Sequence, residues 1–184
     1  CLARQIAQLL NGIDGESDVL EFGAGSGSLA ASLIKELECL DALPERYLIL
    51  ETSPDLQQRQ QQTIRQQAPQ HFERFVWLHS MPEQAINGVI LANEVLDALT
   101  VERFCLESDR ISQLQVTEGP GGFEWTHGPS PQRLQEQVRN ILATLEQEPA
   151  TGYCSEVNTD LPAWLNAVTA NMKNGLALFI DYGY

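Results

Sequence analysis

The chain has little positive charge and no long apolar run. Its 184 residues include 11 lysines and arginines against 25 aspartates and glutamates, a formal net charge of −14. Nucleic acid phosphates and anionic membrane surfaces repel such a chain, so sequence-independent binding to either is disfavoured. Its apolar stretches also stay short of the roughly 20 residues that cross a bilayer. The composition therefore favours neither a nucleic acid partner nor membrane insertion.

Cysteines are few and widely spaced, with no C-x-x-C pair. They are Cys1, Cys39, Cys105 and Cys154. This spacing argues against a zinc site and against a disulfide framework, so we expect reduced thiols in a cytoplasmic protein. The three histidines also lack partners at metal-ligand spacing, and no metal site is expected.

The length of the chain, with 43% hydrophobic residues, suits one domain with a proper core and is too short for two ordinary ones. We therefore expect one domain over residues 1–184. The sequence starts at Cys1 without an initiator methionine and stops just after an apolar run. It is therefore expected to be part of a longer chain, incomplete at both ends. Apolar residues at helical spacing after Cys1 favour an amphipathic helix over a lipidated N-terminus.

Apolar runs alternate with segments of helical spacing along most of the chain. Buried strands are expected at residues 19–22, 47–51, 75–78, 88–93 and 176–181. Helices are expected at 28–40, between Pro54 and Pro69, at 132–148, and at 161–173 with Gly175 closing the last one. This alternation predicts an α/β fold, with a mostly parallel sheet and helices on both faces. Short runs separated by Asp109 and by glycines predict a small antiparallel β insertion at 101–126, after the fourth strand.

The segment VLEFGAGSGSL at residues 19–29 predicts a nucleotide pocket. Its glycines, Gly23, Gly25 and Gly27, let the backbone approach a ligand, and the helix that follows turns free N–H groups toward it. Taken without their neighbours, the glycines can also be explained by a tight structural turn that binds no ligand. A dinucleotide fingerprint needs a third glycine where Ser28 stands, which weakens the case for an NAD-dependent dehydrogenase.

Two acids after apolar strands favour S-adenosylmethionine as the nucleotide. Glu21, two residues before the first glycine, would repel a pyrophosphate but could pair with an ammonium or lie near a sulfonium. Glu51 follows the next apolar strand, 30 residues later, and can accept hydrogen bonds from both ribose hydroxyls. In an open α/β sheet the ligand binds beyond the carboxyl ends of the strands. Further polar residues are expected there at Asn93, Glu94 and Asp181.

The segment from Asn93 to Asp97 follows the fourth strand, where a methyl acceptor would meet the sulfonium. The carboxylates of Glu94 and Asp97 could hold a guanidinium by bidentate, charge-assisted hydrogen bonds. A guanidinium nitrogen is a poor nucleophile, so its orientation and the localisation of its charge would supply much of the catalysis. The alternative is that both acids stand at the N-terminus of a helix and interact with its dipole.

Four segments together resemble one family. They are LEFGAGSG at 20–27, LETSPDL at 50–56 with Gln60, ANEVLDAL at 92–99, and IDYGY at 180–184. The combination resembles the mitochondrial complex I assembly-factor arginine methyltransferase and its bacterial, MidA-like relatives, over nearly the whole chain. The resemblance implies a Rossmann-like class I methyltransferase fold that uses S-adenosylmethionine. It places the protein in the bacterial cytoplasm, or in the mitochondrial matrix of a eukaryote.

By position, the resemblance implies a cofactor-binding set of Glu21, Gly23, Gly25, Gly27, Glu51 and Asn93. The candidate catalytic residues, on the acceptor side, are Asn93, Glu94 and Asp97. One departure is Thr100, where the family pattern has proline.

The function expected from the sequence is methylation of a protein arginine with S-adenosylmethionine and without a metal. The mitochondrial members are linked to a complex I subunit, which makes such a subunit the candidate substrate. A small-molecule methyltransferase and a methyltransferase-like assembly factor without turnover are the alternatives.

Overall fold

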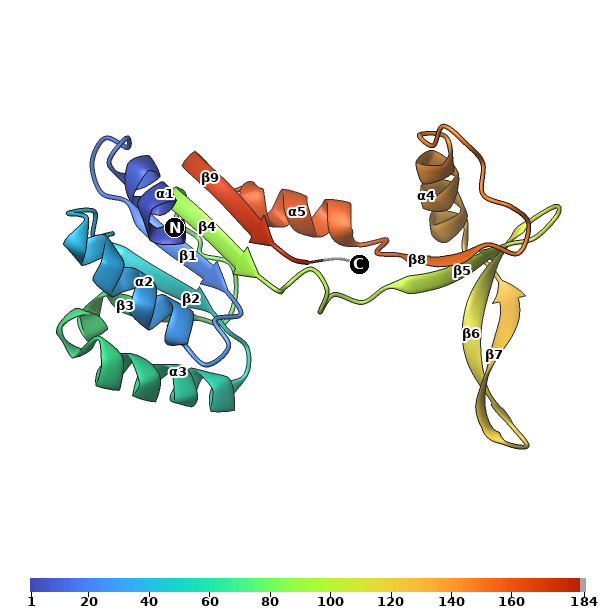
Figure 1. Cartoon of the computed structure of the whole chain (residues 1–184), viewed down its shortest axis with the longest axis horizontal. Helices are drawn as coiled ribbons and strands as arrows, with labels where there is room; N and C mark the ends of the chain where they lie inside the picture. The colour runs from blue at the N-terminus through green and yellow to red at the C-terminus, as the bar shows by residue number, and fades with distance from the viewer. Residues whose placement is uncertain (183–184) are drawn as a thin grey trace. The chain divides into compact units, whose positions relative to one another are not determined.

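The chain divides into two units of different architecture (Figure 1). A computed structural model describes residues 1–182. The first unit takes in Cys1–Ala98 and the chain from Leu165 onward, and the second takes in Leu99–Trp164. The second unit extends well beyond the insertion expected at 101–126. A single domain over residues 1–184 stays a prediction.

A parallel sheet forms the centre of the first unit. Within residues 1–182, its strands are β1 (Asp18–Phe22), β2 (Arg46–Leu50), β3 (Phe75–Leu78), β4 (Ile86–Asn93) and β9 (Met172–Ile180). They run parallel in the order β3-β2-β1-β4-β9. The arrowheads of β1, β4 and β9 accordingly point the same way in Figure 1. The mostly parallel sheet expected from the apolar runs is confirmed.

Helices flank this sheet and supply much of its core. They are α1 (Leu2–Leu10), α2 (Ser28–Cys39), α3 (Pro54–Gln67) with the 3₁₀ helix η1 (Pro69–Arg74), and α5 (Leu161–Thr169). Buried side chains of α1, α2 and α3 pack with those of β1, β2 and β4 in one cluster. The start of α3 is as expected, because Ser53 Oγ accepts a hydrogen bond from the N–H of Leu56 at 3.4 Å and Pro54 is the first helical residue.

The amino ends of four strands are joined by a row of residues across the sheet. Arg46 of β2 binds Asp18 of β1 through two nitrogens, at 2.9 and 2.8 Å from the carboxylate oxygens. Asp18 is opposite Gly88 of β4, which is opposite Gly175 of β9. A Cβ atom on Gly88 would lie 1.9 Å from the Asp18 carbonyl oxygen, and one on Gly175 would lie 1.7 Å from that of Gly88. Both positions therefore require glycine.

Two helix ends differ from those expected. Gly175 does not close a helix, because α5 ends at Thr169 and β9 begins at Met172. α4 (Gln132–Leu142) ends well before residue 148. Its carboxyl end unwinds into a turn, in which the N–H and hydroxyl of Thr144 both bond the Ile141 carbonyl oxygen, at 3.0 and 2.7 Å.

The second unit is built on an antiparallel sheet. Its strands are β5 (Glu102–Leu106), β6 (Ile111–Gly119), β7 (Gly122–Pro129) and β8 (Cys154–Val157), in the order β7-β6-β5-β8. Phe104 of β5 packs with Leu134 and Val138 of α4 in a small core. The antiparallel strands expected after the fourth strand of the parallel sheet are confirmed as β5 to β7. β8 was not expected.

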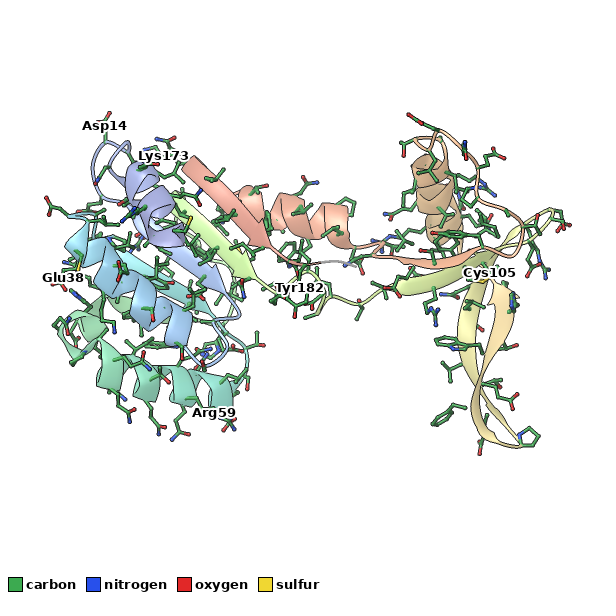
Figure 2. The ribbon with its side chains drawn as sticks, viewed as in Figure 1. Asp14, Glu38, Arg59, Cys105, Lys173 and Tyr182 are labelled. Atoms are coloured by element: carbon green, nitrogen blue, oxygen red, sulfur yellow. A yellow bond between two sulfur atoms is a disulfide. The ribbon has the colours of Figure 1, made fainter. Side chains whose placement is uncertain are left out.

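Cys105 and Cys154 form a disulfide, so the expectation of reduced thiols is wrong for this pair. They come together because Cys105 on β5, labelled in Figure 2, is opposite Cys154 on the antiparallel β8, with their Cα atoms 4.1 Å apart. Their separation of 49 residues in the sequence hides this pairing. Cys1 and Cys39 are free and exposed.

Across residues 1–182, no helix combines the length and the apolar character that a membrane span needs.

Candidate functional site

The glycine loop between β1 and α2 borders a pocket at the carboxyl ends of the strands. The pocket has a volume of about 390 Å³. Its lining residues are Glu21, Gly23, Ala24, Gly25, Ser26, Leu29, Asn93 and Glu94. The loop that the sequence assigns to a nucleotide and the end of β4 that it assigns to an acceptor therefore meet in one place.

Gly27 shows why this loop needs glycine. It is the N-cap of α2 and has a left-handed backbone, with φ +80°. A Cβ atom here would lie 3.0 Å from the Cα atom of Gln60, so the loop and α3 are in backbone contact. By contrast, a Cβ atom on Gly25 would meet no atom of the described residues within 4 Å. The open side of Gly25 faces the space in which a ligand can approach the backbone.

Glu21 is a buried acid at the floor of the pocket. Its relative exposure is 2%, and Tyr47 on the neighbouring strand β2 donates a hydrogen bond from its hydroxyl to Glu21 Oε2 at 2.6 Å. Burial raises the pKa of Glu21 to about 7, against the lowering effect of the Tyr47 hydrogen bond. Burial also raises the pKa of Tyr47 well above its ordinary value. A cation placed beside Glu21 would favour the ionised carboxylate.

Glu51, after the end of β2, is held by groups on the segment that follows it. Its exposure is 7%, its Oε1 accepts the N–H of Ser53 at 2.9 Å, and its Oε2 accepts Gln60 Nε2 at 3.1 Å. Gln57 Nε2 donates to the Glu51 carbonyl oxygen at 2.6 Å. Ionised carboxylate oxygens can each accept further bonds, so this side chain can still receive two hydroxyl donors.

Gln60 is the site residue whose role sequence reasoning missed. The composition of the glutamine-rich stretch at 57–67 indicates a solvated helix face, but the exposure of Gln60 is 0%. The signal in the sequence is its spacing, because Gln60 lies four residues after Leu56 and four before the buried Ile64. Those three positions share one face of a helix.

The loop after β4 carries a cluster of carboxylates. Glu94 has a left-handed backbone, with φ 55°, and its N–H bonds to the Ile180 carbonyl oxygen at 2.8 Å. Asp181 accepts the N–H groups of Leu96 and Asp97 at 3.4 and 3.2 Å. One carboxylate oxygen from each of Glu94, Asp97 and Asp181 lies within 4.8 Å of the others. Partial desolvation, with Asp97 and Asp181 nearby, raises the pKa of Glu94.

The alternative interpretation of Glu94 and Asp97 as residues at a helix N-terminus is wrong. Within the described residues, the chain runs as turns and bends from Glu94 to Thr100. Their carboxylates instead face each other and Asp181, which makes the end of this loop strongly negative. Such a cluster suits a planar cation with several N–H donors, such as a guanidinium.

The pocket brings most of the site residues expected from the sequence together. Glu21, Gly23, Gly25, Asn93 and Glu94 line it. Gly27 ends the loop as the N-cap of α2 and does not line the pocket. Glu51 is joined to the loop through Gln60, and Asp97 is joined to the pocket through its cluster with Glu94. Gly183 and Tyr184, which close the last segment of the family resemblance, lie outside the described residues.

The chain is similar to known proteins over its whole length. A family model described as "Putative S-adenosyl-L-methionine-dependent methyltransferase" matches residues 1–184. Two crystal structures of Burkholderia thailandensis proteins superpose with a TM-score of 0.86 each, at 34% and 36% sequence identity. The second was solved with S-adenosyl-homocysteine bound.

Both structures cover 100% of this chain, which in turn covers 47% and 46% of theirs. The chain thus spans about half the length of these relatives. None of the curated proteins compared matches it.

Proposed function

We propose S-adenosylmethionine-dependent methyl transfer as the function, because the chain belongs to the family of S-adenosyl-L-methionine-dependent methyltransferases that matches it from residue 1 to 184. One observation carries the proposal most directly: the pocket joins the glycine loop, the buried Glu21 and the end of β4. A bound S-adenosyl-homocysteine in a relative of 36% identity supports the same ligand class.

The residues of this chain fit that cofactor. Glu51 offers acceptors for a ribose diol, Glu21 offers a carboxyl for a cationic methionine portion, and Gly25 leaves the backbone open to it. S-adenosylmethionine supplies an electrophilic methyl group when it is bound. The chain supplies the rest of the catalysis by orienting an acceptor nitrogen and by holding its proton and its charge.

We propose a protein arginine as the acceptor, with Asn93, Glu94 and Asp97 on its side of the site. The cluster of Glu94, Asp97 and Asp181 supports this choice, because a guanidinium can bond two carboxylates at once. Localising the guanidinium charge on the nitrogens that face these carboxylates leaves more electron density on the nitrogen that reacts. A raised pKa suits Glu94 to accept a proton from that nitrogen. A respiratory complex I subunit is the candidate protein, on the family resemblance.

The experiment that tests the cofactor is a calorimetric titration of the full-length protein with S-adenosylmethionine and, separately, with NAD. Glu51→Ala is the test variant, and Glu73→Ala, which removes an exposed acid elsewhere in the first unit, is the matched control. We expect binding of S-adenosylmethionine alone, lost in Glu51→Ala and kept in Glu73→Ala. Binding of NAD instead would overturn the proposal.

The acceptor is tested with S-adenosylmethionine labelled in its methyl group. Incubation with cell extract, followed by separation of protein from metabolites and acid hydrolysis of the protein, should place the label on methylated arginine. Label in metabolites would indicate a small-molecule methyltransferase. Cofactor binding without any transfer would favour an assembly factor without turnover.

A further inference from the structure

We propose that Gln60 is a positioning residue of the cofactor site, which fixes the Glu51 carboxylate against the glycine loop and makes binding depend on an intact ribose diol. The inference rests on the proposed cofactor and deepens it. It is drawn from the contacts of one buried amide, whose exposure is 0%.

The orientation of the Gln60 amide follows from its partners. The indole N–H of Trp77 can only donate, so Gln60 Oε1, 3.0 Å away, is its acceptor. The amide nitrogen of Gln60 then faces two acceptors, the Gly25 carbonyl oxygen and Glu51 Oε2, each at 3.1 Å. Gln60 therefore donates one N–H to each, and the amide cannot flip without placing its oxygen against two other acceptors.

Backbone contacts hold α3 close to the loop. A Cβ atom on Gly27 would lie 3.0 Å from the Cα atom of Gln60 and 3.2 Å from its carbonyl oxygen. One turn earlier, the Gln57 side chain bonds the Glu51 backbone at 2.6 Å. Gln60 is thus a short link between the two parts of the site that the sequence assigns to different portions of the ligand.

The consequence for Glu51 is a fixed carboxylate plane. Ser53 bonds one oxygen and Gln60 the other, so the carboxylate cannot rotate without losing a bond. Each oxygen keeps a further lone pair for a donor. A vicinal diol has two hydroxyls to fill these positions, whereas a 2′-deoxyribose has one. Without Gln60, only the Ser53 bond would hold the carboxylate, so it would be less well fixed and the advantage of the second hydroxyl would shrink.

The test compares two ligands on matched variants of the full-length protein. The ligands are S-adenosyl-homocysteine and its 2′-deoxyadenosyl counterpart, and the readout is the ratio of their dissociation constants. The test variant is Gln60→Met, because methionine keeps the length of the side chain and is a good helix former. Gln62→Met, an exposed position on the same helix, is the matched control. Thermal unfolding of every variant is recorded alongside.

In the wild-type protein we expect the ribose form to bind at least about 10-fold more tightly than the deoxy form, in line with a hydrogen bond to a charged group. Gln60→Met should narrow this ratio to within about 3-fold, mainly by weakening the ribose form, and Gln62→Met should leave it unchanged. Trp77→Phe, which keeps Gln60 but frees its amide to flip, should reduce the ratio by a smaller factor. It also provides the test if Gln60→Met does not fold.

A merely structural role for Gln60 gives a different pattern. In that case the variants lower the unfolding temperature and weaken both ligands by the same factor, so the unchanged ratio overturns the proposal. A wild-type ratio near 1 overturns it as well. Failure of the wild-type protein to bind either ligand points instead to a wrong cofactor assignment, on which the proposal rests.

Discussion

The hydroxyl of Tyr47 donates a 2.6 Å hydrogen bond to the carboxyl of Glu21, and both side chains are buried between the strands β1 and β2 and the helices that cover them. The pairing places an acid with a pKa of about 7 beside the pocket. Because the helices α1 and α2 contribute apolar side chains to this core, burial is the main influence on the acid. Glu94 is the other acidic residue that lines the pocket.

Glu21 should reduce the stability of the ligand-free protein at alkaline pH. Its pKa is raised in the folded state from 4.5 to about 7, so the folded protein holds the proton more tightly than the unfolded chain does. The free energy of unfolding should therefore fall between pH 4.5 and pH 7, by about 3 kcal/mol. The free energy of unfolding of Glu21→Gln should equal that of the wild-type protein below pH 4.5 and should be higher by that amount at pH 8. Denaturant unfolding at both values measures the difference, and parallel curves would contradict the assignment.

Binding of S-adenosylmethionine should release a proton from Glu21 at pH 6. A cationic ligand stabilises the carboxylate, so affinity should rise with pH and level off above pH 7. Calorimetry in two buffers of different ionisation enthalpy gives the number of protons released. Glu21→Gln should show no such release. Tyr47→Phe should shift the curve to higher pH, because the hydroxyl lowers the pKa of Glu21.

Glu94→Gln and Asp97→Asn should lower turnover and spare cofactor binding. Removing a carboxylate that orients the acceptor is expected to reduce kcat by about 10²-fold or more. Binding of S-adenosylmethionine should stay within about twofold, unlike in Glu51→Ala, because Glu51 lies on the cofactor side. Single-turnover rates and calorimetry separate the two effects, with Glu73→Gln as the control. Equal losses of cofactor affinity in all three site variants would contradict this division of roles.

Gly27→Ala should destabilise the first unit more than Gly25→Ala does. Both positions have positive φ, which costs a non-glycine residue about 1 kcal/mol or more. Only Gly27 adds a close approach to the Gln60 backbone, so we expect a total of about 2–3 kcal/mol there and about 1 kcal/mol for Gly25→Ala. Denaturant unfolding tests the order. Gly25→Ala should nevertheless weaken cofactor binding, because the new methyl group would occupy the space through which a ligand can approach the backbone.

The disulfide predicts a count of reactive thiols. The chain unfolded without a reductant should have two reactive thiols, Cys1 and Cys39, and reduction should raise the number to four. Reduction should also lower the free energy of unfolding by about 2–4 kcal/mol, because the bond closes a long loop. A thiol-reactive dye and denaturant unfolding measure both quantities. Cys39→Ser should lose one thiol without changing stability, whereas four thiols before reduction would contradict the bond.

The parallel sheet and the glycine loop could be predicted from the sequence because their signals are local. An apolar run of four to six residues followed by glycine, or by an acid, marks both a buried strand and its functional end. For the same reason Glu21, Glu51 and Asn93 were placed correctly at the ends of β1, β2 and β4.

Features that depend on pairing between distant segments could not be predicted. β8 is only four residues long, with a partly exposed Ser155 and an exposed Glu156, so no apolar pattern marks it. Its pairing with β5 brings Cys154 to Cys105, which the sequence separation conceals. Gln60 was missed for another reason. A polar glutamine is expected on the solvent-exposed face of a helix, although the spacing of Gln60 in the sequence indicates the buried face.

The row of Arg46, Asp18, Gly88 and Gly175 lies at the amino ends of the strands, and the pocket lies at the carboxyl ends. Mutations at the two edges of one sheet should therefore impair the protein in different ways, one through the amount of folded protein and the other through its turnover. Replacing Gly88 or Gly175 by a residue with a side chain lowers the fraction of molecules that fold, while each folded molecule keeps its activity. A substitution at Glu94 leaves the fraction of folded molecules unchanged and lowers the turnover of each one. Overexpression in a complementation assay should rescue the first kind of mutant and leave the second defective.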